Sequence, residues 1–284
     1  KNKMNFLRLG MAYADRVSTL SPTYAKELAA TKEFKDNWAP LLHKKPLVGI
    51  THGIDLLVWN PKTDANIRSK FSADDTSNKS QAREALQRAS GLTVDGSAIV
   101  AAYAGPLTDE RGADGFIAAA PDLVKLGMQV IIAADLPTAH KKAAEALAKK
   151  HPHHVHLRFA FDEEYLHLLV AGATVLVKPS RHEVSGQFQR IALAYGTIPV
   201  VRAVGGIADG LTDVDTPKTG GNAFIMKKAD AADIVKTMKR VAEHHAKHED
   251  WQAIVGKAMS TPVGWTASAK EYDEFYRNLV KESK

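Results

Sequence analysis

The residues best suited to chemistry lie in one segment, 178–189, which reads Lys-Pro-Ser-Arg-His-Glu-Val-Ser-Gly-Gln-Phe-Gln. A helical pattern starts at Gly186, and a glycine at a helix N-terminus offers backbone N–H groups and the positive end of the helix dipole to a phosphate. Glu183, just before it, is suited to hold sugar hydroxyls or to balance a developing positive charge. A second candidate loop, 204–209, carries a glycine pair that lets the backbone approach a ligand closely. Either loop alone is a weak signal, since glycines at such turns more often serve packing.

Both loops follow strand-like segments, in a chain that alternates strand and helix from about Ser97 onward. The strand-like runs are continuous and aliphatic, as expected of strands buried on both faces. This alternation predicts an α/β fold: a doubly wound, mostly parallel Rossmann-like sheet, whose ligands bind beyond the carboxyl ends of its strands. The predicted strands are 98–104, 129–134, 154–160, 174–178, 198–202 and 223–226, and the predicted helices are 115–126, 138–150, 163–171, 186–195 and 230–245.

Residues 1–62 follow a different pattern. They contain a helical segment, two short strand-like segments and a good helix start at 21–23, Ser-Pro-Thr. Two strands and their helices cannot close a core of their own, so we interpret 1–62 as a remnant of a second Rossmann-like domain with its hinge. The expected division is 1–62, a Rossmann-like domain at 63–264 and a C-terminal crossing helix at 265–284.

Composition excludes several classes of protein. The 284 residues are 45% hydrophobic and 25% charged, which is typical of a folded globular chain, and no apolar run reaches a membrane span of roughly 18 residues. The net charge is +6, and the lysines and arginines are scattered along the chain among acids, without a basic stripe or a nucleic-acid motif. The absence of cysteine excludes disulfides and thiolate metal sites and fits a reducing compartment, the cytoplasm or an organelle interior (plastid or mitochondrion). We expect a soluble protein that has no membrane span and binds no nucleic acid.

The order, spacing and flanks of these loops resemble those of the glycogen and starch synthases. The resemblance implies a GT-B fold, in which two Rossmann-like domains face each other across a cleft, and retaining transfer of glucose from ADP-glucose or UDP-glucose without a metal. It makes 63–264 a domain of the nucleotide-sugar-binding type. It also implies that the Lys-x-Gly-Gly loop of the N-terminal domain is missing. The segments that carry it are 13–25, 53–55, 59–61, 178–183, 195–202, 205–209 and 265–272.

The resemblance assigns roles to individual residues. The Glu of the family's Pro-Ser-Arg-Phe-Glu motif falls on Glu183, and a phosphate-binding Lys falls on Arg111, which keeps the charge. The Arg of the same phosphate loop falls on Pro106, which cannot donate a hydrogen bond from side chain or backbone. The remaining candidate binding residues are Gly186, Gln187, Gly205 and Gly206.

Three further motifs depart from the family pattern. The Asn-Gly-Ile-Asp hinge reads His-Gly-Ile-Asp at 52–55, and the Gly-x-Gly turn reads Ala-Ala-Asp-Leu-Pro at 133–137. The Cys-Gly-Leu-Thr motif reads Ser-Gly-Gln-Phe at 185–188. Bulkier residues in place of glycine crowd a nucleotide. We interpret these differences as a site that has drifted from catalysis.

Two functions follow from the resemblance. The first is a degenerate, non-catalytic relative that acts as a structural or binding subunit of a larger assembly and needs no cofactor. It would bind a protein partner on the face left by the missing domain, because an exposed apolar face usually finds one. α-Glucan is a further candidate ligand. The alternative is an active glucosyltransferase, completed by an N-terminal domain, that extends an α-1,4-glucan. In that case the donor diphosphate would lie against Arg111 and the amides around Gly186, with Glu183 near the glucose.

Other chemistry is less well supported. Histidines cluster at 151–156 and 244–248, but no acid joins them at a recognisable ligand spacing, so we expect surface histidines. Ser185 precedes a glycine at a strand-to-helix turn, yet the Gly-x-Ser-x-Gly pattern of hydrolases is not there. Trp251, Trp265 and the aromatics at 272–276 have helical spacing, which favours helix packing over a carbohydrate platform.

Overall fold

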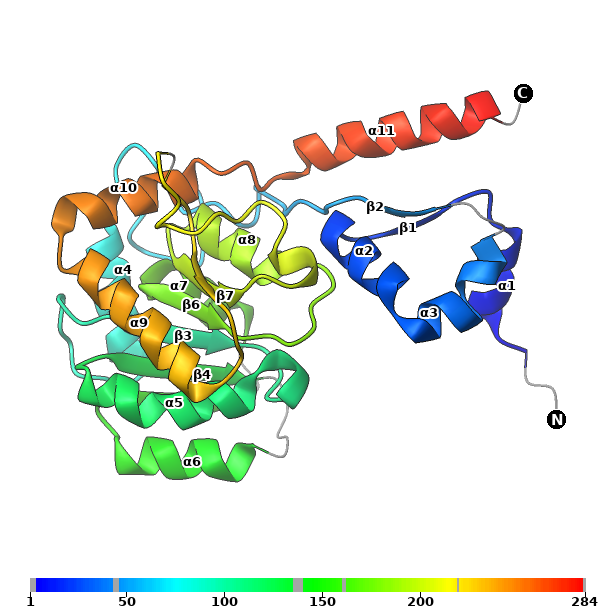
Figure 1. Cartoon of the computed structure of the whole chain (residues 1–284). Coiled ribbons are helices and arrows are strands. Elements are labelled where there is room, and N and C mark those ends of the chain that lie inside the picture. Colours follow the sequence, from blue (N-terminus) through cyan, green and yellow to red (C-terminus); the bar gives the residue numbers. More distant parts are fainter. Residues whose placement is uncertain (1–3, 43–45, 135–139, 160–161, 219, 283–284) are drawn as a thin grey trace.

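The computed structural model describes residues 4–42, 46–134, 140–159, 162–218 and 220–282 (Figure 1). Its centre is a six-stranded parallel sheet in the order β5-β4-β3-β6-β7-β8. The central strands β3 and β6 pair in parallel, and the chain order reverses there, which confirms the predicted doubly wound α/β fold. The strands are β3 (Val100–Ala104), β4 (Gln129–Ala134), β5 (Val155–Phe159), β6 (Val175–Lys178), β7 (Ile198–Arg202) and β8 (Phe224–Met226).

Helices cover both faces of this sheet, because alternate residues of each buried strand face opposite ways. On β3, Tyr103 belongs to one apolar cluster with Phe116 of α5, and Ala102 belongs to the other with Leu169 of α7. The helices of this domain are α4 (Lys79–Ala89), α5 (Ala113–Lys125), α6 (Lys141–Lys150), α7 (Glu163–Gly172), α8 (Gln187–Ala194), α9 (Ala231–His245) and α10 (His248–Met259).

Helix α4 is absent from the elements that the sequence predicts. Its apolar pattern is thin, since Ala82 and Leu86 are its buried hydrophobic residues. The buried Gln87 replaces a third apolar contact with hydrogen bonds, donating from Nε2 to the carbonyl of Asp95 and to Oε1 of Gln129. A helix whose buried side chains are partly polar lacks the apolar periodicity from which helices are predicted.

The N-terminal residues form a smaller part beside this domain. Strands β1 (Val17–Thr19) and β2 (Leu47–Gly49) pair in parallel. The predicted helix start is confirmed, because Oγ of Ser21 accepts from the N–H of Tyr24 at 2.9 Å. The helices here are α1 (Phe6–Tyr13), α2 (Pro22–Ala30) and α3 (Lys32–Asn37).

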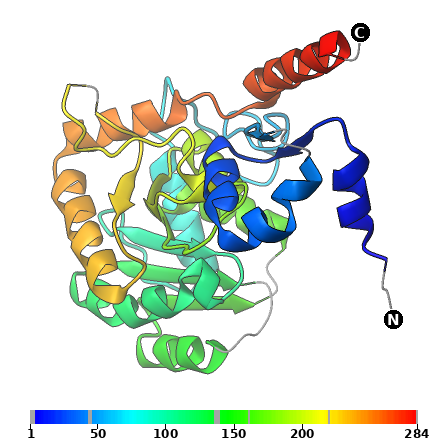
Figure 2. The ribbon, with the colours of Figure 1, turned by 45° about the vertical axis from the view of Figure 1, so that its right-hand side comes forward.

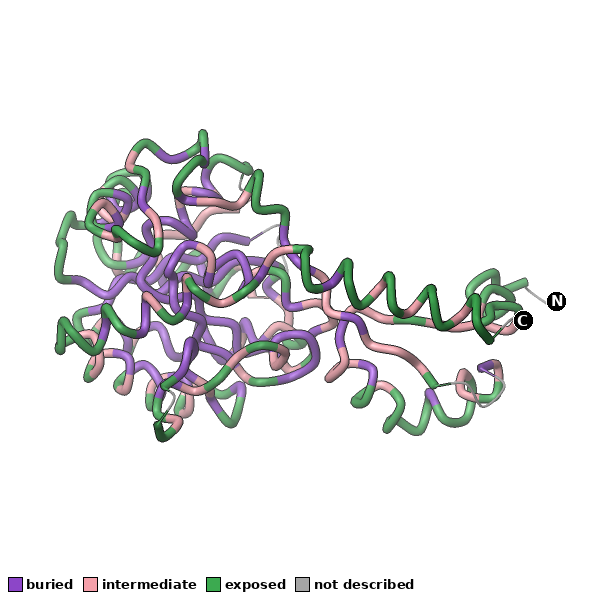
Figure 3. The backbone as a smooth tube through the Cα atoms, turned by 90° about the horizontal axis from the view of Figure 1, so that it is seen from above, coloured by how far each residue is buried: buried purple, intermediate pink, exposed green. Residues whose placement is uncertain are grey.

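The last helix, α11 (Trp265–Glu282), leaves the large domain and lies along the N-terminal part (Figures 1 and 2). Ser268 donates to the carbonyl of Thr51, and Arg16 pairs with Glu282 at 2.6 Å. Figure 3 shows buried residues concentrated in the large domain, whereas α11 is exposed along most of its length. Among the described helices, none is long and apolar enough to cross a membrane.

Candidate functional site

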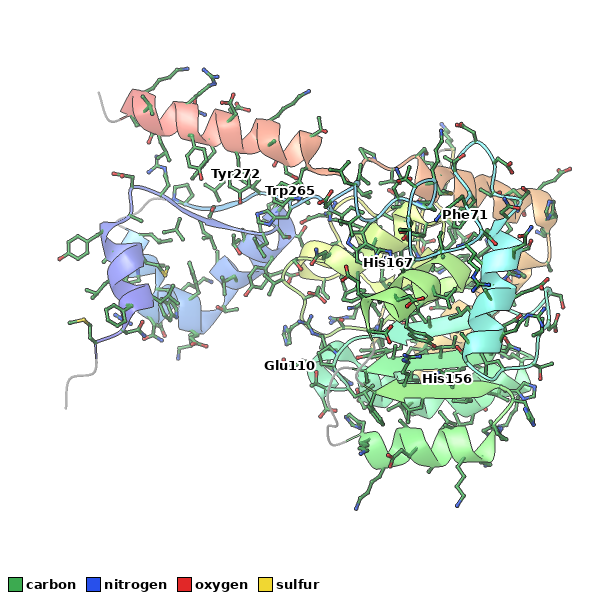
Figure 4. The ribbon with its side chains drawn as sticks, turned by 180° about the vertical axis from the view of Figure 1, so that it is seen from behind. Phe71, Glu110, His156, His167, Trp265 and Tyr272 are labelled. Carbon is green, nitrogen blue, oxygen red and sulfur yellow. The ribbon has the colours of Figure 1, made fainter. Side chains whose placement is uncertain are left out.

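Three loops meet at the carboxyl edge of the sheet, after the neighbouring strands β3, β6 and β7. The N–H of Arg181, after β6, donates to the carbonyl of Glu110, after β3, at 2.7 Å. The guanidinium of Arg181 also forms a bidentate pair with Asp114, both distances 2.7 Å, and these hydrogen bonds lower the pKa of that carboxyl. Figure 4 marks this edge with Glu110. The loop after β6 that the sequence selected is therefore fixed to the loop after β3.

Glu183 lies at the centre of this edge, held by two cations. Its Oε2 lies 2.5 Å from Nη1 of Arg111, which belongs to the short helix η2 (Asp109–Arg111), and 3.9 Å from Nζ of Lys178, the last residue of β6. Nη1 of Arg111 also donates to the carbonyl of His182 at 3.1 Å. Glu183 is 8% exposed, and a carboxylate so buried needs such partners. Arg111, the predicted phosphate ligand, is thus engaged by a carboxylate of its own chain.

The glycine pair contacts protein as well. The N–H of Gly205 donates to both carboxylate oxygens of Glu27 in α2, at 3.0 and 3.1 Å. A Cβ on Gly205 would lie 1.7 Å from the carbonyl oxygen of Glu183, and its φ of 47° favours glycine. Gly206 donates to that same carbonyl at 3.3 Å. The packing role that the sequence left open for these glycines is present in the structure.

Gly186 and Gln187 occupy the start of α8, as predicted. Gly186 has a φ of 63°, and an added Cβ would lie 2.4 Å from the carbonyl oxygen of Gly206. Gln187 is exposed, and no side chain caps the helix. Beside it, the ring of Phe188 lies 4.9 Å from Nζ of Lys178. Phe188 therefore contacts the same lysine that faces Glu183.

Two of the family departures have visible consequences. Pro106 is exposed, and its carbonyl accepts from the hydroxyl of Tyr103 at 2.6 Å. His52 packs against α11, with its ring 4.7 Å from that of Trp265 and its Nε2 2.8 Å from the hydroxyl of Tyr272 (Figure 4). Of the departure at 133–137, residues 135–137 lie outside the described part of the chain.

The contacts of Glu27 and Asp209 with this edge were not predicted from the sequence. Asp209 follows β7 and accepts hydrogen bonds from Oγ of Ser21 and, at 2.6 Å, from Oγ1 of Thr23. These partners lie 178 to 188 positions away along the chain, so no local spacing could have revealed them. The arrangement joins α2 to the carboxyl edge of the sheet. In the described residues no group of three or more histidines and acids is placed to hold a metal ion.

Comparisons with known proteins agree on one family. The family of glycosyl transferases group 1 matches residues 87–255, and the starch synthase catalytic domain matches residues 1–44. A glycogen synthase of Paracidovorax citrulli is 36% identical over 277 residues, covering 96% of this chain and 54% of the relative. One of Anaeromyxobacter sp. (strain Fw109-5) is 34% identical, covering 98% of this chain and 59% of its own length. The chain thus spans little more than half of these curated relatives.

Solved structures show the same likeness. The catalytic domain of starch synthase IV from Arabidopsis thaliana, bound to ADP and acarbose, superposes with a TM-score of 0.90 at 30% identity. That match covers 97% of this chain and 58% of the other. A sucrose-phosphate synthase from Thermosynechococcus elongatus, at 19% identity and a TM-score of 0.64, shows the shared fold.

Proposed function

The chain belongs to the glycosyl transferases of group 1, and the predicted likeness to glycogen and starch synthases is confirmed. We propose that it is a synthase-like protein whose own donor site does not transfer glucose. It acts instead as a structural or binding subunit of a larger assembly. If its site did act, the relatives imply retaining transfer from a nucleotide sugar. The proposal rests on how the groups at the carboxyl edge of the sheet are engaged.

The observation that carries the proposal is that carboxylates of this chain occupy the groups suited to a diphosphate. Arg111 is paired with Glu183 at 2.5 Å, and the N–H of Gly205 donates to Glu27. A diphosphate entering here must displace both acids, or lie beside them and be repelled. Like charges a few ångströms apart disfavour each other by kilocalories in a partly buried site.

The balance of charge points the same way. Arg111 and Lys178 supply two positive charges, and Glu183 cancels one of them. Pro106 adds none where the resemblance expects an arginine. In glycosyl transfer from a nucleotide diphosphate, positive groups stabilise the leaving-group charge, a contribution of about 3 kcal/mol in comparable electrostatic sites. With that stabilisation reduced, binding is a better-supported role than transfer.

The proposed protein partner covers the N-terminal part. Phe6, Leu7 and Tyr13 of α1 are 78%, 64% and 86% exposed, and an apolar patch of this kind usually contacts another protein surface. α-Glucan remains the second proposed ligand, by analogy with the starch synthase IV structure that contains acarbose.

The test is a titration of the chain with ADP-glucose and with UDP-glucose, followed by thermal unfolding. A ligand that binds the folded state alone stabilises it by about 2.7 kcal/mol at a hundred times its Kd. We expect no saturable shift at millimolar concentration, while the starch synthase IV catalytic domain serves as positive control. A saturable shift in this chain, or labelled glucose incorporated into a glycogen primer, would overturn the proposal.

A further inference from the structure

A cavity of about 680 Å³ lies at the end of the large domain opposite to the loops just described. Gly96 and Thr174, which line it, precede β3 and β6, so it opens at the amino ends of the strands. The start of α4, the end of α9 and the start of α10 form its walls. In Figure 4 the nearby Phe71, whose ring centre lies 5.4 Å from Nζ of Lys79, marks this end of the molecule.

Two cations of α4 line this cavity, and both are bound to neutral groups. Nζ of Lys79 donates to the carbonyls of Ala171 and Tyr195 and to Oγ1 of Thr197, at 2.8 to 2.9 Å. Nη1 of Arg83 donates to the carbonyl of Gly96 at 2.7 Å.

Nε of Arg83 is buried and has no hydrogen-bond partner among the described residues. Asp95 attracts the guanidinium of Arg83, but at longer range than the hydrogen bond to Gly96. The wall therefore carries positive charge that no described carboxylate contacts at ion-pair distance.

The electrostatics agree with this geometry. Burial lowers the pKa of Lys79 well below its usual range, and the neighbouring Arg83 lowers it further. Burial and then the charge of Arg83 lower the pKa of His245 to about 4. Perturbed groups gathered around one cavity are typical of sites that bind a ligand. Burial is the larger cause of both shifts, and an anion would offset the second cause, the charge of Arg83.

The start of α4 adds a second feature. The helix begins at Lys79 with no side-chain cap, and Ser77 and Ser80 line the cavity next to it. Hydroxyls and the amide end of a helix suit phosphate oxygens. The hydroxyl of Ser80 donates at present to the carbonyl of Ser77 at 2.9 Å, so it would have to turn toward an anion. Asp74 and Asp75 also line the cavity, next to the start of α4, and the carboxylate of Asp75 already accepts from the N–H of Ser77 at 3.0 Å.

We propose that this cavity binds a small anion of the phosphate class, with Arg83 as its principal ligand and the start of α4 completing the site. The oxygens of the anion would accept from the guanidinium of Arg83 and from the hydroxyl of Ser80, which would give up its hydrogen bond to the carbonyl of Ser77. The site is separate from the carboxyl edge of the sheet, so it does not depend on the function proposed above.

The experiment titrates inorganic phosphate into the full chain at constant ionic strength, with chloride as the balancing anion, and follows binding by calorimetry. We expect saturable binding in the millimolar range or tighter, weakened at least about tenfold by Arg83→Gln, since charge-assisted hydrogen bonds of this kind contribute that much. Arg88→Gln is the matched control, because Arg88 is on the same helix but exposed and paired with Glu84. That variant should bind phosphate like the unmodified chain.

A second measurement covers the case in which Arg83→Gln fails to fold. In the unmodified chain, phosphate should shift the backbone amide resonances of residues 76–83 before any others. Absence of saturable binding at ten millimolar would overturn the proposal. So would shifts that map to the loops after β3, β6 and β7, or binding lost in Arg111→Gln and kept in Arg83→Gln.

Discussion

Glu183→Gln is the sharpest perturbation of the carboxyl edge, because it removes a negative charge and keeps the shape of the side chain. The carboxylate lies 2.5 Å from Arg111 and is almost fully buried, while the Arg111 side chain is 30% exposed. Breaking a fully buried pair on one side destabilises a protein by about 3 to 5 kcal/mol. Arg111 keeps its contact with water and its hydrogen bond to His182, so we expect a loss of about 2 kcal/mol.

The same change should improve anion binding. Without the carboxylate, Arg111 can turn its guanidinium to a diphosphate, and a charge-assisted hydrogen bond of that kind contributes about 1.5 to 3 kcal/mol. We therefore expect the Kd for ADP to fall by at least about tenfold while the melting temperature falls by about 4 to 8 °C. General damage to the fold would lower both the stability and the affinity for ADP. A loss of stability together with a gain of affinity therefore distinguishes the proposed effect from such damage.

The assay pairs calorimetric titration of ADP with thermal unfolding of the same preparation. Glu110→Gln is the matched control: it removes an exposed carboxylate from the same edge, where the backbone carbonyl of Glu110 makes the contact with Arg181. Unchanged or weaker ADP binding in Glu183→Gln would refute the idea that the carboxylate blocks the cation. It would favour a role for Glu183 in holding the ligand.

Three further outcomes are expected. Pro106→Arg adds a cation at an exposed position and should raise ADP affinity about tenfold by calorimetry; no gain would make crowding by Phe188 the stronger obstacle. Gly205→Ala should destabilise the fold by at least about 2 kcal/mol in urea unfolding, because its Cβ would meet the carbonyl of Glu183, whereas Gly96→Ala, with nothing within 4 Å, should stay near the parent value. Burial lowers the pKa of His245 to about 4, so the unfolded chain binds a proton at this histidine more readily than the folded chain does. The free energy of unfolding should therefore rise by about 2 kcal/mol between pH 4 and 6.5. His245→Phe should flatten that rise, and an equal slope in both proteins would contradict it.

Hydrophobic continuity is the reason the sheet could be predicted. Strands such as β4 and β7 are buried along their length, and their limits agree with the predicted 129–134 and 198–202. The positions of Glu183, Arg111 and the glycine pair at one edge follow from the same topology. The contacts that decide what these residues do could not be predicted, since Glu27 and Ser21 reach the edge from the other end of the chain.

The contacts of the carboxyl edge also change how its motif residues should be weighed. Glu183 holds Arg111 and Lys178, and its carbonyl accepts from Gly206. Gly205 accommodates that carbonyl and binds Glu27 of α2. Each therefore has a structural role in this chain that is independent of any donor, so their presence is no argument for catalysis. A ligand that accepts from the N–H of Gly205 would have to break the hydrogen bonds from this N–H to the carboxylate of Glu27. Those bonds join α2 to the sheet, so ligand binding at this edge is coupled to the packing of the N-terminal part against the large domain.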